Sequence, residues 1–192
     1  MANRLATRVR MPEGVVSMMR GLFLAVLFVG APGAAMAASG EEVRFVDHLN
    51  DLPADFAWMQ EHDKPMMIFF NASYCGYCRM IDEEFIIPMR LKPKYQDRLL
   101  IRRVQTDGNR DVVGLDGETV GHPKIARQLG VIGVPFVLFF APSGERITSI
   151  SGTAPGYYNV YLDRKVDLAE RCAKDMSPAE CREEIDEPGF NP

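Results

Sequence analysis

Two runs of consecutive apolar residues stand out in the middle of the chain. Met66–Phe70 and Val134–Phe140 contain no charged residue, a pattern that is typical of strands buried on both faces of a sheet. Leu99–Gln105 predicts a third strand. Arg146–Ile150 predicts a fourth strand, which follows Val134–Phe140 through a hairpin turn at residues 141–144.

Apolar residues at helical spacing occupy the segments between and after these strands. They predict four helices, at Asp55–Glu61, Cys78–Met89, Pro123–Leu129 and Val160–Lys174. A further helix is expected from Ser177, because Ser, Pro and an acidic residue follow in the order of a helix start. Residues 106–122 predict a loop. The alternation of strands and helices indicates an α/β fold with a C-terminal helical hairpin.

The first 37 residues have the features of a secretory signal peptide. A basic region (Arg4, Arg8, Arg10 and Arg20) precedes the apolar segment Gly21–Val29, and Ala35–Ala37 forms a small-x-small cleavage site. An uncleaved membrane anchor is the alternative, but this apolar segment is much shorter than the ~20 residues that span a bilayer. We expect export to the periplasm and a mature chain of 155 residues (192 minus 37).

Composition and charge are those of an ordinary globular protein. The chain is 47% apolar and 25% charged, with a net charge of -4. Its length suits one domain with short appendages. A negative net charge offers no electrostatic attraction for nucleic acid. We therefore expect a protein that does not bind nucleic acid. We also expect a monomer.

All four cysteines follow the predicted signal peptide, and export would take them to a compartment in which disulfides persist. Four cysteines allow three pairings. Sequence spacing favours Cys75 with Cys78 and Cys172 with Cys181. The second pair flanks a predicted helix break, so we expect a structural disulfide that joins two helical segments. A second redox pair that relays electrons or regulates Cys75 is the alternative.

Cys75 and Cys78 form a Cys-x-x-Cys motif where a predicted strand meets a predicted helix. The first cysteine then lies at a helix N-terminus, where backbone amides and the helix dipole stabilise a thiolate. A free thiol with a pKa near ~8.5 is only about 3% ionised at pH 7. We expect Cys75 to attack and Cys78 to resolve. The histidines are scattered and the cysteine spacing suits zinc poorly, so we expect no metal and no cofactor.

Residues 71–80 (NASYCGYCRM) and residues 130–136 (GVIGVPF) together resemble the active-site motif and cis-proline loop of the thioredoxin superfamily. The resemblance extends over residues 41–166, which leaves residues 167–192 as a C-terminal helical extension and tail. It implies a thioredoxin-like fold with a central mixed sheet flanked by helices. It also implies that Pro135 is cis, facing the cysteines, and that partners contact five residues: Tyr74, Gly76, Tyr77, Val134 and Pro135.

Within this superfamily, the chain is similar to periplasmic thioredoxin-like proteins of bacterial sulfur-oxidation clusters (SoxW type) and to the C-terminal domain of the membrane thiol reductase. This resemblance implies a thiol-disulfide oxidoreductase that reduces disulfide-containing periplasmic proteins and is recharged by a membrane thiol reductase. A disulfide oxidant or isomerase, or a non-catalytic metal-binding module, is the alternative.

The chain departs from cytosolic thioredoxins beneath the cysteines. Those proteins carry a buried aspartate six residues before the first cysteine, where this chain has Phe69, and a lysine on the neighbouring strand, near Arg103 here. The usual buried proton acceptor is therefore missing. Proton transfer would then depend on Arg103, Glu83 or water.

Overall fold

The computed structural model describes residues 46–95, 97–153, 156–174, 176–177 and 180–181. The predicted signal peptide, the start of the predicted domain and most of the C-terminal tail lie outside the described residues. No helix in the described part of the chain is both long and apolar enough to cross a membrane.

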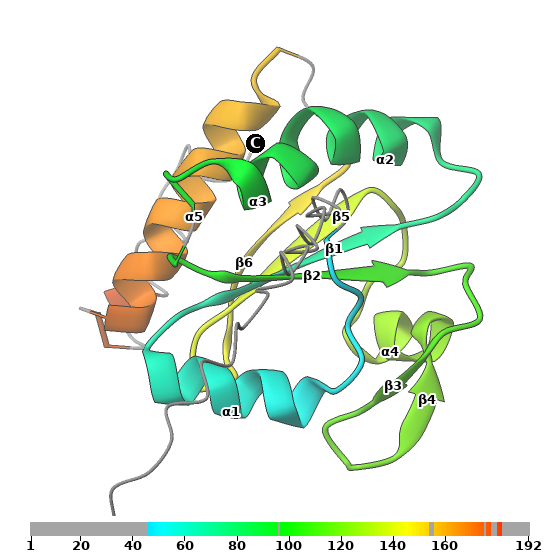
Figure 1. Ribbon diagram of the computed structural model, residues 1–192, viewed down its shortest axis with the longest axis horizontal. Coiled ribbons are helices and arrows are strands. Elements are labelled where there is room, and N and C mark those ends of the chain that lie inside the picture. The colour runs from blue at the N-terminus through cyan, green and yellow to red at the C-terminus, as the bar shows by residue number, and fades with distance from the viewer. Residues whose placement is uncertain (1–45, 96, 154–155, 175, 178–179, 182–192) are drawn as a thin grey trace, which may run out of the picture. The chain divides into compact units, whose positions relative to one another are not determined.

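A four-stranded mixed sheet forms the centre of the fold (Figure 1). The strand order is β2-β1-β5-β6, made from four segments: β1 Met66–Asn71, β2 Leu100–Gln105, β5 Phe136–Phe140 and β6 Arg146–Ser151. β1 is parallel to β2, whereas β1 with β5 and β5 with β6 are antiparallel. All four predicted strands are confirmed, and the two most apolar ones are the central pair.

Helices cover both faces of this sheet (Figure 1). α1 (Leu52–His62) and α4 (His122–Gln128) lie on one face, and α2 (Gly76–Ile81), α3 (Ile87–Leu91) and α5 (Tyr158–Lys174) lie on the other. Alternate residues of β1 divide between the two cores, because successive side chains of a strand point to opposite faces. Ile68 packs with α1 and α4, and Phe69 packs with the helices of the other face.

The predicted helix over Cys78–Met89 is confirmed but is not uniformly α-helical. A π-helical segment, Asp82–Ile86, separates α2 from α3. Pro88 lies just after this segment, and proline lacks the N–H that continues an α-helical ladder. The Ile87 N–H accordingly donates to the Asp82 carbonyl, five residues back.

The prediction of a simple loop at residues 106–122 is wrong. This segment contains an antiparallel hairpin, formed by β3 (Asp111–Val113) and β4 (Thr119–Gly121). Val112 and Val120 pair directly and are both buried. Strands of three residues are too short to show the alternation from which a strand is predicted.

The ends of the described domain pack onto the sheet and its helices. Residues 46–51 run beside β2, where the Arg103 N–H donates to the Asp47 carbonyl and the Leu49 N–H donates to the Arg103 carbonyl, both at 2.9 Å. At the other end, α5 is continuous through the predicted boundary between residues 166 and 167. The second helix of the predicted hairpin lies mostly outside the described residues.

Candidate active site

Cys75 and Cys78 form a disulfide at the junction of β1 and α2, with their Cα atoms 5.2 Å apart. Cys75 is the N-cap residue of α2 and has extended backbone angles (φ -88°, ψ 99°). Its Sγ accepts a hydrogen bond from the Cys78 N–H at 3.1 Å. Amides in the first turn of a helix have no acceptor within the helix, so the Cys78 N–H is available to stabilise a thiolate at this sulfur.

The two cysteines differ in their access to solvent. Cys78 is 1% exposed and belongs to the core beneath α2, whereas Cys75 is partly buried at the edge of that core. The neighbouring side chains of Tyr74 and Tyr77 are 78% and 62% exposed. A partner molecule can therefore reach Cys75 more readily than Cys78.

The turn that precedes Cys75 is tied to the end of β2. The Asp107 carboxylate accepts hydrogen bonds from both the N–H (2.9 Å) and the hydroxyl of Ser73. The hydrogen bond from the Ser73 hydroxyl is the main cause that lowers the pKa of Asp107. We call this pair of hydrogen bonds the Ser73–Asp107 clamp. Beside it, the Thr106 N–H donates to the Asn71 carbonyl at 2.7 Å. Neither Ser73 nor Asp107 was among the site residues predicted from the sequence.

The loop before β5 lies at the same end of the sheet as the disulfide. Its Val134–Pro135 peptide bond is cis, and the Pro135 carbonyl accepts a hydrogen bond from the Gly152 N–H at 3.0 Å. A small cavity of about 110 Å³ beside it is lined by both Tyr74 and Val134. Gly76 is exposed, like Tyr77, at the start of α2, and neither lines this cavity.

An ion pair that is largely shielded from solvent lies on the α2 face of the sheet. Phe69 and Arg103 are register partners on β1 and β2, so their side chains share one face. Phe69 is fully buried and Arg103 is 8% exposed. The Arg103 guanidinium forms a hydrogen-bonded ion pair with the carboxylate of Asp82, the first residue after α2. Glu83, which the sequence suggested for proton transfer, is exposed.

Asp82 was not among the site residues predicted from the sequence. Burial raises the pKa of its carboxyl group, and the charge of Arg103 opposes that rise. A signal for its position was available, because Asp82 follows Cys78 by four residues and such residues share a helix face. The sequence does not show which acidic side chain faces inward, because Asp82, Glu83 and Glu84 are three consecutive acidic residues.

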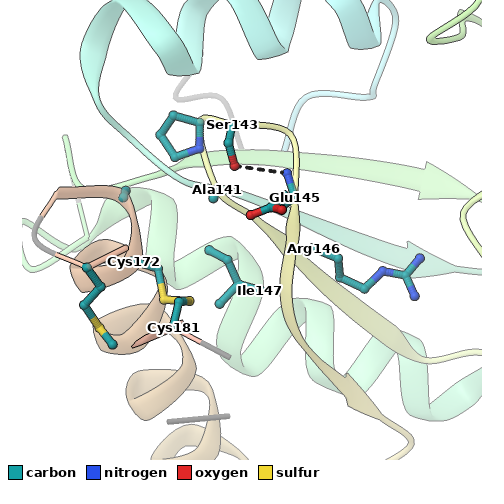
Figure 2. A pocket seen from close by; sticks show the side chains of 10 residues that line it. Ala141, Ser143, Glu145, Arg146, Ile147, Cys172 and Cys181 are labelled. Carbon is teal, nitrogen blue, oxygen red and sulfur yellow. Dashed lines mark hydrogen bonds between the residues drawn. A yellow bond between two sulfur atoms is a disulfide. The ribbon is translucent and has the colours of Figure 1, made fainter. Parts of the chain in front are cut away.

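A larger cavity, of about 410 Å³, lies between the turn after β5 and the end of α5 (Figure 2). Ala141 and Cys172 are among its lining residues. Ala141 directly follows Phe140, the partner of Met66 at the start of β1, whereas Cys75 lies beyond the opposite end of that strand. Cys172 and Cys181 form a disulfide at this cavity. This cavity therefore does not belong to the candidate active site.

Within the described ranges, no group of three or more His, Cys, Asp and Glu side chains is arranged to hold a metal ion. The chemistry that the described residues offer at this end of the sheet is that of a dithiol and its disulfide. One sulfur is accessible and the other is shielded.

Comparisons with known proteins identify one matching family and several similar chains. The profile of a family described as thioredoxin-like matches residues 47–142, half of the 192-residue chain. A thioredoxin of Borreliella burgdorferi is 30% identical over 115 residues, covering 60% of this chain and 85% of that protein. The thiol:disulfide interchange protein DsbD of Campylobacter jejuni is 24% identical over 127 residues, covering 66% of this chain but 21% of that protein. Thioredoxin O2 of Arabidopsis thaliana, solved in its oxidised state, aligns with 65% of this chain and 96% of that chain at 21% identity and a TM-score of 0.45.

Proposed function

Because this chain belongs to the thioredoxin-like family, we propose that it reduces disulfides of exported proteins in the periplasm, acting as a monomer through Cys75 and Cys78. The chain is a thioredoxin-like oxidoreductase with a Cys-x-x-Cys disulfide. One observation carries the proposal: the more accessible sulfur caps a helix N-terminus and the shielded sulfur is bonded to it.

The reaction starts from the reduced dithiol. The Cys75 thiolate attacks one sulfur of the partner's disulfide, that bond breaks, and the partner's other cysteine leaves as a thiolate and takes up a proton. The Cys78 thiol then loses its proton and attacks Cys75 Sγ. The partner departs with both cysteines reduced, and two electrons have left the protein. The Cys75–Cys78 disulfide described above is the product.

Reduction is the direction that the relatives support. Two of them are named thioredoxin and thiol:disulfide interchange protein. The sequence resemblance to the C-terminal domain of the membrane thiol reductase favours the same direction. The latter relationship covers about a fifth of the DsbD chain, so its other parts have no counterpart in the alignment. We assign the electron donor to a membrane thiol reductase, and the compartment to the periplasm because of the predicted signal peptide.

Trapping of mixed disulfides tests the exchange reaction. We expect Cys78→Ser, expressed as the full chain, to accumulate mixed disulfides with insulin and with periplasmic proteins, because the resolving thiol is gone. Cys75→Ser is the matched control and should trap far less, because the accessible nucleophile is missing. If Cys78→Ser forms no more adducts than Cys75→Ser, the proposed exchange mechanism is wrong.

The redox potential of Cys75–Cys78 tests the direction of electron flow. Potentials in this superfamily range from about -270 mV for reductants to about -120 mV for oxidants. We expect a value nearer the reducing end, measured by equilibration with thiol buffers of known potential and differential alkylation. A value near the oxidising end would exclude the reductase and favour an oxidant.

A further inference from the structure

We propose that Asp82 accepts the proton of the Cys78 thiol during the resolving step, and that Arg103 is the positioning residue that holds the Asp82 carboxylate. This inference rests on the proposed thiol-disulfide exchange and deepens it, because it names the group that activates the second cysteine.

Asp82 is placed beside Cys78 by helix geometry. The Asp82 N–H donates to the Cys78 carbonyl, the hydrogen bond of residues four apart in an α-helix. Side chains at this spacing share one face of the helix, with Cβ atoms about 5–6 Å apart. Cys78 lies in the core, and the Asp82 carboxylate accepts a hydrogen bond from Arg103 on β2. The face that the two side chains share is therefore the one that faces the sheet.

The sheet contributes an apolar residue and a cation to this face. Phe69, fully buried on β1, provides no titratable group under α2. Its register partner Arg103 is nearly buried and reaches up from β2 to the Asp82 carboxylate. A cation fixed on the sheet therefore holds the acidic side chain of the helix in place, and a buried carboxylate without such a partner would be costly.

Few other charges act on Asp82. Two charges influence the pKa of Asp82: that of Arg103 on β2 and that of Glu83, the next residue along the helix. The Glu83 side chain is exposed. His48, on the segment beside β2, interacts with Arg103, but burial together with the charges of Arg110 and Arg103 lowers the pKa of His48 to about 4. His48 is therefore neutral at pH 7, and the Asp82–Arg103 pair is the local source of charge.

Burial makes Asp82 a better proton acceptor than an exposed aspartate. A buried carboxylate is destabilised relative to its protonated form, and this raises the pKa of Asp82. A base is most effective when its pKa approaches the working pH. An exposed acid such as Glu84 lacks this advantage and also lies outside the core.

The step balances without any further reagent. The S–H proton of Cys78 passes to the Asp82 carboxylate, and the resulting thiolate attacks Cys75 Sγ in the mixed disulfide. The bond between Cys75 and the partner breaks, and the electron pair of that bond leaves with the partner's thiolate. Asp82 is protonated at the end of the step and returns its proton to the partner's thiolate or to solvent.

The test separates the two cysteines kinetically. Reduced full-length protein mixed with 5,5′-dithiobis(2-nitrobenzoate) releases one thionitrobenzoate when Cys75 attacks and a second when Cys78 resolves. We expect Asp82→Asn to slow the second release by about tenfold or more at pH 7, and the first release to change much less. We expect the second release to recover in Asp82→Asn as the pH rises.

The direction of the effect is decisive. If Asp82 acted only as a nearby negative charge, its removal would favour the Cys78 thiolate and accelerate the second release. An unchanged or accelerated second release in folded Asp82→Asn would overturn the proposal. Glu84→Gln, on the same helix run, is the matched control and should match the wild type.

Conservative variants keep the test informative if Asp82→Asn folds poorly. Asp82→Glu retains a carboxylate and should restore most of the second release. Arg103→Lys retains the cation and should keep the pH profile closer to the wild type than Arg103→Met does. If the wild-type protein itself gives no second release, then the proposed exchange function fails, and this result is distinct from a failure of Asp82 alone.

Discussion

Single residues explain why the two sulfurs of one disulfide have different roles. Cys75 is partly exposed at the helix start, whereas Cys78 is enclosed by the core one turn later. A partner must therefore meet Cys75 first. Cys78 reacts with Cys75 Sγ once that sulfur is bonded to the partner, which keeps the resolving step intramolecular and fast.

Asp107 controls the position of Cys75 through the turn that precedes it. We expect Asp107→Ala to lower the rate of insulin reduction by about three- to tenfold, because small displacements of reacting atoms reduce the rate. Turbidity assays with dithiothreitol as the electron donor measure this rate. Ser73→Ala removes the hydroxyl donor but keeps the backbone N–H donor to Asp107, so it should lose less activity. A wild-type rate in Asp107→Ala would contradict the positioning role.

Two helices place the two disulfides in opposite electrostatic settings. Cys75 caps the N-terminus of α2, whereas Cys172 lies in the last turn of α5. The helix dipole favours negative charge at the first position and disfavours it at the second. A Cys172 thiolate is therefore less stable than a Cys75 thiolate, and the Cys172–Cys181 bond should resist reduction more strongly.

The Cys172–Cys181 bond should act as a staple on α5 rather than as a redox centre. We expect the double variant Cys172→Ser with Cys181→Ser to lose somewhat under ~3 kcal/mol of unfolding free energy, the value for so short a loop. Urea denaturation monitored by circular dichroism measures this loss.

Insulin reduction by the same double variant separates the structural role from the alternative of a second redox pair. With a purely structural bond, the activity should remain close to the wild-type value at temperatures at which the variant is folded. A severalfold loss of activity in the folded variant would instead support electron relay through Cys172 and Cys181.

At the scale of the whole molecule, one buried and one partly buried histidine make the stability of the folded domain depend on pH. His122 is fully buried, its Nδ1 accepts a hydrogen bond from the Gln105 N–H at 3.2 Å, and its Nε2 therefore donates to the Leu49 carbonyl at 2.8 Å. Burial lowers the pKa of His122 and, with nearby arginines, lowers that of His48 to about 4. The His122 ring therefore joins the segment beside β2 to the rest of the domain, and the His48 ring on that segment lies 5.7 Å from it, centroid to centroid.

These shifts predict that mild acid destabilises the protein. Between pH 6.5, the ordinary histidine pKa, and about pH 4, the unfolded chain binds protons that the folded domain does not, so stability falls as the pH falls. After discounting for the partial exposure of His48, we expect a loss of about 1–3 kcal/mol between pH 7 and pH 4.5. Urea unfolding at both pH values measures this loss.

His48→Gln is the control for the acid effect. It should reduce the difference in stability between pH 7 and pH 4.5, because one of the two titrating groups is gone. The raised pKa of Asp82 acts in the opposite sense, since a folded state that takes up a proton more readily gains stability in acid. A stability that is unchanged or greater at pH 4.5 would contradict the histidine account.

Much of the fold could be predicted because its signals are local. Continuous apolar runs predicted the central strands, and helical spacing predicted four helical stretches, which the structure has at residues 52–62, 76–91, 122–128 and 158–174. The hairpin at residues 111–121 escaped prediction because its strands have three residues each. The π-helical segment before Pro88 escaped because a shift of one hydrogen bond leaves no clear mark on apolar periodicity.

The sequence by itself determined the dithiol motif and its place between a strand and a helix. It also determined that Phe69 stands where cytosolic thioredoxins carry a buried aspartate. These features depend on residues that are neighbours in the chain. Only the tertiary structure decided what surrounds the motif: the Ser73–Asp107 clamp joins residues 34 apart, and the Asp82–Arg103 pair joins residues 21 apart. Such contacts arise from strand register and helix packing, which decide which of several similar acidic side chains on the helix is paired with the sheet.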